Sequence, residues 1–263
     1  MNKKRVLFVD DEIEVLNSLE RQMKSEIQFV SIFESDPLKV IDVITNNPVD
    51  IIVADIVMPN LDGISLLHQL KEKFPNIMRI MLTAHGDYET SMRAINEADV
   101  FGFITKPWSK DYLIGHIRMA AKVLENLRES NGEKFTVSKP QIIITELSDK
   151  NGIRPIKFTT GLSQVQLEQV ISRVFMSLTG FVEPSERFNQ TLYSIPLNDQ
   201  GLAARGYLSI MDDEKDLPFG VFIIMNSNEF DSLGNYDALL QKIAEKVQND
   251  ERLDLEEMLK SYN

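Results

Sequence analysis

Five short apolar runs in the first 110 residues constrain the fold more than any other feature of this sequence. They lie at residues 6–9, 29–33, 51–54, 80–82 and 101–104. Their first residues are 23, 22, 29 and 21 positions apart, which leaves room for one helix in each gap. Continuous apolar runs are typical of strands that are covered on both faces, and such strands usually belong to parallel sheets.

Helical periodicity in the gaps supports this reading. Three gaps have apolar residues that recur every three or four positions, the spacing of one helix face: Ile13, Leu16, Leu19 and Met23; Leu38, Ile41 and Ile44; and Ile64, Leu67 and Leu70. Ser35 or Asp36 is expected to cap the second of these helices, and residues 90–98 contain no helix breaker. Strands that alternate with helices predict an α/β fold, a doubly wound five-stranded parallel sheet.

Polar side chains follow four of the predicted strands. Asp10 and Asp11 follow the first, Asp55 the third, Thr83 the fourth and Lys106 the fifth. Because the carboxyl ends of parallel strands meet at one edge, where ligands bind, we expect these side chains to converge. Mg²⁺ relieves the repulsion among such carboxylates and still leaves room for a phosphate. Asp55 stands alone on its strand and is the candidate nucleophile for phosphoryl transfer, with Lys106 and Thr83 facing the phosphoryl oxygens.

Four segments resemble the receiver domain of bacterial two-component response regulators. They are Val-Leu-Phe-Val-Asp-Asp-Glu at 6–12, Ile-Val-Ala-Asp-Ile-Val-Met-Pro-Asn-Leu-Asp-Gly at 52–63, Met-Leu-Thr-Ala-His-Gly-Asp at 81–87 and Phe-Ile-Thr-Lys-Pro-Trp at 103–108. The resemblance covers residues 1–125. It implies a flavodoxin-like receiver fold, Mg²⁺ as the cofactor, and phosphorylation by a partner sensor histidine kinase or a small phosphodonor.

The resemblance also implies a role for each polar residue at the edge of the sheet. Asp55 would be the phosphoacceptor. The Mg²⁺ ligands would be Asp10, Asp11, Asp55 and the backbone carbonyl of Val57. A receiver that keeps the fold but is never phosphorylated is the alternative, and the presence of every required side chain argues against it.

The same resemblance assigns a conformational switch. Thr83 would be the hydroxyl that swings toward the phosphoryl group, and Phe103 the aromatic residue that turns inward. Lys106 would contact the phosphoryl group, and the bond to Pro107 would be cis. Such a receiver catalyses its own phosphorylation and dephosphorylation, with Asp55, Thr83 and Lys106 as the catalytic residues.

A heptad pattern follows the receiver. Leu113, Ile117, Ala120, Leu124 and Leu127 step by four, three, four and three residues. We expect the first half of this helix to pack on the receiver, and its distal part to pair with another chain or to dock a second domain. Asn131-Gly132 is the expected helix stop. The predicted division is a receiver at 1–125, a helical extension and linker at 126–140, and an output domain at 141–263.

The second half is acidic and has a different pattern. Residues 141–263 hold 11 Lys and Arg against 19 Asp and Glu, a net charge of −8. The pattern predicts an α+β domain with strands at 141–145, 156–159, 191–197, 202–211 and 220–225, and helices at 163–178, 236–247 and 253–259. Residues 198–201 are expected to form a hairpin turn. An acidic tip at 212–216 is expected to be a solvated loop end, with a cation site as the weaker alternative.

These patterns predict a response regulator in which Mg²⁺-dependent phosphorylation of Asp55 controls an output domain that does not bind DNA. Its excess of negative charge makes a polyanion a poor partner, so we expect the output to be protein interaction or homodimerisation. An enzyme or ligand-binding module of unfamiliar sequence is one alternative, and a DNA-binding transcription regulator is another. The downstream protein partner is not identified, and no separate output enzyme is identified either.

The composition excludes several other classes of site and location. The chain has no cysteine, which excludes disulfides, thiolate metal sites and cysteine nucleophiles. It has no apolar run long enough to span a bilayer, and the acidic residues at 10–12 interrupt any signal-peptide pattern. We therefore expect a cytoplasmic protein without a membrane partner.

Overall fold

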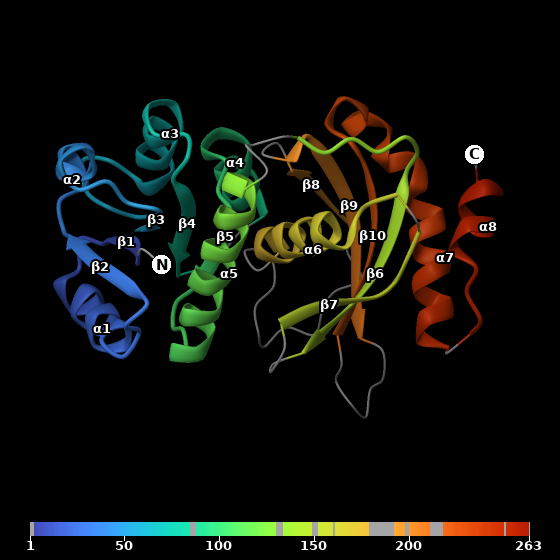
Figure 1. Ribbon diagram of the computed structural model, residues 1–263, viewed down its shortest axis with the longest axis horizontal. Coiled ribbons are helices and arrows are strands. Elements are labelled where there is room, and N and C mark those ends of the chain that lie inside the picture. The colour runs from blue at the N-terminus through green and yellow to red at the C-terminus, as the bar shows by residue number, and fades with distance from the viewer. Residues whose placement is uncertain are drawn as a thin grey trace. The chain divides into compact units, whose positions relative to one another are not determined.

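The structure is a computed structural model, and it describes residues 3–84, 88–129, 134–148, 152–159, 161–178, 192–197, 200–210, 218–249 and 251–262. The chain divides into two compact units, residues 1–132 with 176–183 and residues 133–175 with 184–263. Two sheets, each of five strands, organise the protein (Figure 1). Within the described ranges, no helix is both long and apolar enough to cross a membrane.

The first sheet, sheet A, is parallel throughout and confirms the predicted receiver fold. Its strand order is β2-β1-β3-β4-β5, so the chain reverses direction across the sheet next to β1. The strands are β1 (Lys4–Val9), β2 (Phe29–Glu34), β3 (Ile51–Asp55), β4 (Met78–Thr83) and β5 (Gly102–Thr105). The helices are α1 (Ile13–Met23), η1 (Pro37–Lys39), α2 (Val40–Asn46), α3 (Gly63–Lys73), α4 (Tyr88–Ala98) and α5 (Lys110–Glu129). Asp36, and not Ser35, caps η1, because its side chain accepts from the backbone N–H of Leu38.

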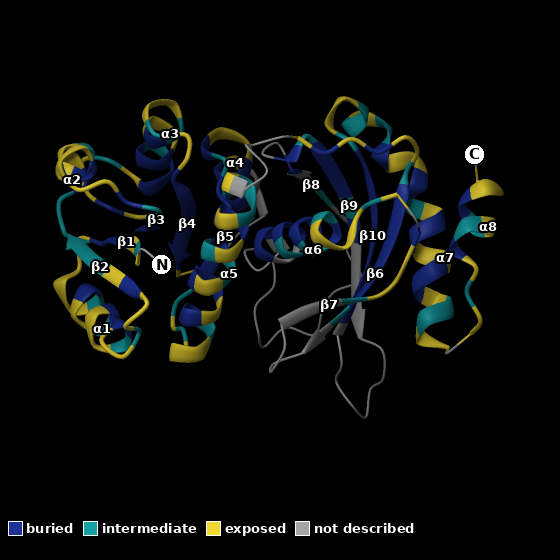
Figure 2. Ribbon diagram, in the orientation of Figure 1, coloured by how far each residue is buried: buried dark blue, intermediate teal, exposed yellow. Residues whose placement is uncertain are grey.

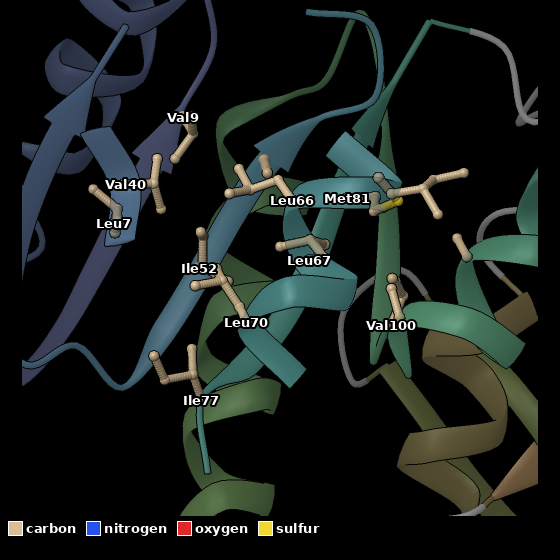
Figure 3. Packing of buried hydrophobic residues seen from close by; sticks show 14 of the residues in the cluster. Leu7, Val9, Val40, Ile52, Leu66, Leu67, Leu70, Ile77, Met81 and Val100 are labelled. Atoms are coloured by element: carbon tan, nitrogen blue, oxygen red, sulfur yellow. The ribbon is translucent and has the colours of Figure 1, made fainter. Parts of the chain in front are cut away.

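Strands β1, β3, β4 and β5 are buried on both faces, which explains why they read as continuous apolar runs, whereas the edge strand β2 is mostly half-buried. On one face, Leu7 and Ile52 lie in a cluster with Leu66 and Leu67 of α3, and α2 and α4 extend the same cluster (Figure 3). Alternate strand residues, such as Phe8, are equally buried on the other face, where α1 and α5 contact the sheet. In Figure 2, inner strands such as β1 and β4 are dark blue, whereas much of β2 is teal.

The first turn of α3 lies directly against the end of β3. Asp62 caps this helix, because its carboxylate accepts from the backbone N–H of Ser65 at 3.0 Å. The N–H of Gly63 donates to the carbonyl of Ile56 at 2.9 Å. A Cβ on Gly63 would overlap the backbone oxygen of Asp55, so only glycine allows this close approach.

The second sheet, sheet B, is antiparallel and confirms the predicted second α+β domain. Its strand order is β7-β6-β10-β9-β8. The strands are β6 (Gln141–Ser148), β7 (Gly152–Phe158), β8 (Leu192–Leu197), β9 (Leu202–Ile210) and β10 (Pro218–Asn226). The helices are α6 (Gln164–Leu178), η3 (Ser227–Tyr236), α7 (Asp237–Gln248) and α8 (Leu255–Lys260). Each predicted strand and helix of this half overlaps an observed one, whereas η3 was not predicted.

Helices cover both faces of sheet B. Val221 and Ile223 of β10 share a buried cluster with Leu240 and Ile243 of α7 and with Leu255 of α8. The apolar helix α6 lies on the opposite side of the sheet (Figure 1). Its first turn is held by a reciprocal pair, in which the N–H of Gln166 donates to Ser163 Oγ and the N–H of Ser163 donates to Gln166 Oε1. Ser163 therefore caps α6.

Each edge strand of sheet B carries a proline within the strand. Pro155 lies in β7 and Pro196 lies in β8. Proline has no backbone N–H to donate, so a strand from another molecule cannot form a continuous ladder at either position. The positions of both prolines agree with the restriction of proline to edge strands.

Part of the predicted linker is attached to the second unit. The backbone N–H of Phe135 donates to the carbonyl of Gln200 at 2.8 Å. Val137 exchanges two hydrogen bonds with the side chain of Asn226, and both Phe135 and Val137 are buried. The sequence signals at Asn131-Gly132, at residues 198 and 199 of the hairpin turn, and in the acidic tip at 212–216 lie outside the described residues.

The contact at Gly63 gives a stability prediction. Substitution Gly63→Ala should lower the free energy of unfolding of the receiver by about 1–3 kcal/mol, because the new methyl group has to displace backbone. Substitution Gly115→Ala is the matched control, since no heavy atom lies near a Cβ at this position in α5. It should raise the free energy by about 0.5–1 kcal/mol. Urea unfolding followed by the emission of Trp108, the sole tryptophan, measures both, and equal effects would contradict the close approach.

Buried His116 predicts how the stability of the receiver depends on pH. Its side chain in α5 is only 4% exposed, and burial lowers the pKa of the imidazole to about 4. The unfolded chain takes up a proton near the ordinary pKa and the folded chain does not, so stability falls as the pH drops below about 6.5. The loss should reach about 2 kcal/mol at about pH 5. In the variant His116→Leu, the free energy of unfolding, measured by urea unfolding, should lose this part of its dependence on pH. An unchanged pH dependence in this variant would show that His116 is not its source.

Candidate functional site

The predicted polar residues gather at the carboxyl edge of sheet A. Asp10 follows β1, Asp55 is the last residue of β3, Thr83 is the last residue of β4 and Lys106 follows β5. The strand order places β1, β3, β4 and β5 next to one another. Residues from four separate parts of the sequence thus reach one place.

Lys106 joins two buried carboxylates. Its Nζ lies 2.8 Å from Asp10 Oδ2 and 2.6 Å from Asp55 Oδ1. The other oxygen of each carboxylate accepts a hydrogen bond of 3.0 Å from a backbone N–H of the loop that follows, that of Glu12 for Asp10 and that of Val57 for Asp55. Asp10 is fully buried and Asp55 is 7% exposed. Both carboxylates are therefore fixed at both oxygens.

Burial and charge act in opposite directions on these groups. Burial raises the pKa of the Asp55 carboxyl, and Lys106 only partly offsets this, so its pKa stays above the ordinary value. Burial lowers the pKa of the Lys106 ammonium, but its hydrogen bonds with Asp10 and Asp55 outweigh burial and leave its pKa raised. The lysine is therefore held in its charged form between the two acids.

Thr83 and Phe103 lie next to this pair. Thr83 is 2% exposed, and its backbone carbonyl accepts from the N–H of Lys106 at 2.7 Å. Phe103 is fully buried in the cluster that contains Ala94 and Ile95 of α4. The aromatic ring is therefore packed inside the domain and not exposed to solvent. The peptide bond between Lys106 and Pro107 is cis, as the resemblance implies.

The carboxylates of Asp10 and Asp55, which share the Lys106 ammonium, are ligands of the kind that Mg²⁺ prefers. Mg²⁺ is commonly held by one or two carboxylates together with waters and phosphate oxygens. Asp11 is exposed, as is the side chain of Val57, at 80%. In the ranges that the structure describes, no three acidic or histidine side chains are grouped so as to hold an ion by themselves. Asp10 and Asp55 therefore supply two buried carboxylates of the kind that a Mg²⁺ site uses.

Sequence reasoning missed the groups that support this pair. The backbone N–H groups of Glu12 and Val57 carry no sequence signal, because any residue except proline supplies one. The pattern around Gly63 does not indicate that this glycine lies against the backbone of Asp55. The contact of Trp108 with Gln22, at 3.1 Å between Nε1 and Oε1, joins residues that no local pattern connects. His85, the loop residue two positions after Thr83, lies outside the described residues.

Comparison with known proteins agrees with this geometry. The family model described as the response regulator receiver domain matches residues 6–118. The hydrogenase transcriptional regulatory protein HoxA of Cupriavidus necator is 32% identical over 117 residues, which are 44% of this chain and 24% of HoxA. The DNA-binding transcriptional regulator NtrC of Proteus hauseri is 32% identical over 146 residues, 54% of this chain and 30% of NtrC. The match thus spans less than a third of either relative's length.

A further relative matches over a longer stretch. The probable transcriptional regulator ycf27 of Cyanophora paradoxa is 31% identical over 179 residues, 66% of this chain and 73% of ycf27. Among solved structures, the signal receiver domain of an HD domain-containing protein from Pseudomonas fluorescens Pf-5 is 26% identical, with a TM-score of 0.47, and covers 49% of this chain and 94% of that one. The chain belongs to the response regulators, and residues 6–118 are its receiver domain.

Proposed function

We propose that a sensor histidine kinase or a small phosphodonor phosphorylates this protein on Asp55, with Mg²⁺ as the cofactor. The observation that carries the proposal is the position of the Lys106 ammonium between the carboxylates of Asp10 and Asp55. Response regulators as a family receive a phosphoryl group in this way. An ammonium beside a buried carboxylate suits a reaction that adds negative charge to that carboxylate.

The chemistry follows from the two oxygens of Asp55. One oxygen attacks phosphorus, and the new P–O bond forms as the bond from phosphorus to the donor breaks. The N–H of Val57 and the ammonium of Lys106 hold the carboxylate in place for this attack. When bound by Asp10, Asp11, Asp55 and the Val57 carbonyl, Mg²⁺ supplies positive charge for the phosphoryl oxygens. Because such transfers depend mainly on positioning and charge neutralisation, these fixed groups supply most of what catalysis requires.

Thr83 and Phe103 link this chemistry to the far side of the receiver. The hydroxyl of Thr83 turns toward the phosphoryl group, and the bond from the Lys106 N–H to the Thr83 carbonyl couples β4 to β5. Phe103 is already buried against α4. In this proposal, phosphorylation stabilises the buried position of Phe103.

For the second domain we propose an output that does not bind DNA and acts through protein interaction or homodimerisation. Its net charge of −8 opposes contact with phosphates. The names of HoxA and NtrC describe proteins of which this chain matches only a minor part. DNA binding is the second candidate, because the match to ycf27, a probable transcriptional regulator, covers 66% of the chain and so exceeds the receiver.

The domain division that we propose is 1–125 for the receiver, 126–140 for the helical extension and linker, and 141–263 for the output domain. The hydrogen bonds of Phe135 and Val137 favour counting 134–140 with the output domain. Leu124 of α5 is buried and Leu127 is half-buried. We propose that the α5 seam beyond Leu124 joins the receiver signal to the output domain or to a second chain.

The phosphorylation proposal is tested with Asp55→Asn. In the presence of acetyl phosphate and Mg²⁺, the wild-type chain should gain one phosphoryl group per molecule, and Asp55→Asn should gain none, because an amide oxygen is a poor nucleophile. Intact-mass spectrometry measures the gain. Stoichiometric labelling of Asp55→Asn would refute the assignment.

Lys106→Ala serves as the comparison in the same assay. This variant keeps Asp10, Asp11 and Asp55, so it should still bind Mg²⁺. Labelling should slow by about 100-fold or more, because the positive charge of the ammonium is lost. Labelling of Lys106→Ala at the wild-type rate would show that the ammonium has no part in the reaction.

The output proposal is tested by retention on nucleic acid. The full-length protein, with or without acetyl phosphate, should show no binding to duplex DNA that weakens as salt rises, because an acidic domain releases few counterions. Fluorescence anisotropy of a mixed-sequence duplex across a salt series measures this. A linear fall of log affinity with log salt would overturn the proposal in favour of the DNA-binding candidate.

A further inference from the structure

Helix α1 is connected at its start to Asp10 and near its end to the loop that carries Lys106. At its start, the backbone N–H of Glu12 donates to Asp10 Oδ1. Near its end, the side chain of Gln22 accepts from the indole N–H of Trp108 at 3.1 Å. Trp108 lies two residues after Lys106. One helix is therefore in contact with a carboxylate of the site and with the loop that carries the lysine.

These contacts form a closed ring. The ring runs from Asp10 through Lys106 and Trp108 to Gln22, and along α1 and Glu12 back to Asp10. The hydrogen-bonded residues of the ring are 96 positions apart for Asp10 and Lys106, 86 for Gln22 and Trp108, and 2 for Asp10 and Glu12. A lysine side chain has four rotatable bonds, so its own torsions leave the position of the ammonium free. The ring of contacts restricts that position.

Backbone hydrogen bonds hold both ends of the loop that carries Lys106. The loop spans the four positions from 106 to 109, between β5 and α5. Its first residue donates from its N–H to the Thr83 carbonyl, and its last residue, Ser109, accepts from the N–H of Tyr112 at 3.2 Å. Between them, the side chain of Trp108 reaches α1 through its hydrogen bond with Gln22, and both residues are half-buried.

Neighbouring contacts orient the same two helices. Lys110 Nζ donates to Ser25 Oγ at 2.7 Å, and Arg118 pairs with Glu26 at 2.7 Å. These contacts join the end of α1 to α5 and not to the loop. These contacts hold α5, which begins where the loop ends, whereas the Gln22–Trp108 hydrogen bond holds a residue within the loop.

We propose that Gln22 and Trp108 are positioning residues for phosphoryl transfer, because they hold the loop that places Lys106 Nζ against both Asp10 and Asp55. The inference rests on the proposed function of Asp55. Neither residue touches the reacting atoms, so each acts through Lys106. Loss of their bond should slow the transfer and leave the affinity for the phosphodonor unchanged.

The test compares three variants of the full-length protein. Gln22→Leu removes the acceptor, Gln22→Glu keeps an acceptor of the same length, and Arg21→Leu places the same apolar side chain at an exposed position of α1. Labelling by acetyl phosphate with Mg²⁺ is followed by intact mass over a range of acetyl phosphate concentrations. The emission of Trp108 in each variant reports whether the indole N–H has lost its partner.

For Gln22→Leu, the maximal rate of labelling should fall about five- to tenfold, the effect of one lost hydrogen bond on the reacting geometry. The half-saturating concentration of acetyl phosphate should stay within about twofold. Gln22→Glu should restore the rate to within about twofold of the wild type, and Arg21→Leu should label as the wild type does. Trp108 emission should shift to longer wavelength only in Gln22→Leu.

Two results would overturn the inference. One is a wild-type maximal rate in Gln22→Leu while Trp108 emission shows that the bond is lost. The other is an equal loss of rate in Gln22→Glu, which would mean that the packing of Gln22 matters and its hydrogen bond does not. Failure of the proposed function looks different, because the wild-type chain itself would then remain unlabelled or Asp55→Asn would be labelled.

Discussion

The ammonium of Lys106 shared between two buried carboxylates is the interaction on which the rest of the receiver depends. Asp10 and Asp55 lie on neighbouring strands and both are almost entirely buried. Two ionised carboxylates in such surroundings repel each other and lose hydration, so an unpaired arrangement would cost several kcal/mol. One lysine from a third strand end pairs with both carboxylates and offsets part of their charge. The backbone N–H groups of Glu12 and Val57 satisfy the oxygens that the lysine does not reach.

That interaction places demands on distant parts of the domain. The parallel order of sheet A has to bring β1, β3, β4 and β5 to the same edge. Gly63 lets α3 begin against the backbone of Asp55, and α1 spans the distance from Asp10 to the loop that carries the lysine. With these elements in place, the carboxylate of Asp55 is held at both oxygens. For the proposed phosphoryl transfer, such preorganisation would lower the barrier.

In the second domain, the apolar pattern predicted the regular strands and helices but not the packing of the segment before them. Alternating apolar positions located its strands and helices, because a strand or helix needs one apolar face wherever it packs. The same reasoning read residues 126–140 as extension and linker, yet Phe135 and Val137 are buried and hydrogen bonded to Gln200 and Asn226. Two apolar residues in a short polar stretch give no periodicity. The helix η3 escaped prediction because it follows the shorter repeat of a 3₁₀ turn and carries few apolar residues.

The sequence by itself determined the parallel sheet, the order of its elements and the set of polar residues at its carboxyl edge, because these depend on local periodicity and on which residue follows each strand. Only the tertiary structure decided which of those residues touch. Asp10 is buried and Asp11 is exposed, since adjacent residues at a strand end point in different directions and one edge has room for one of them. The partner of Trp108 was equally hidden, because Gln22 lies 86 positions away and a hydrogen bond between distant segments exists only once the chain has folded.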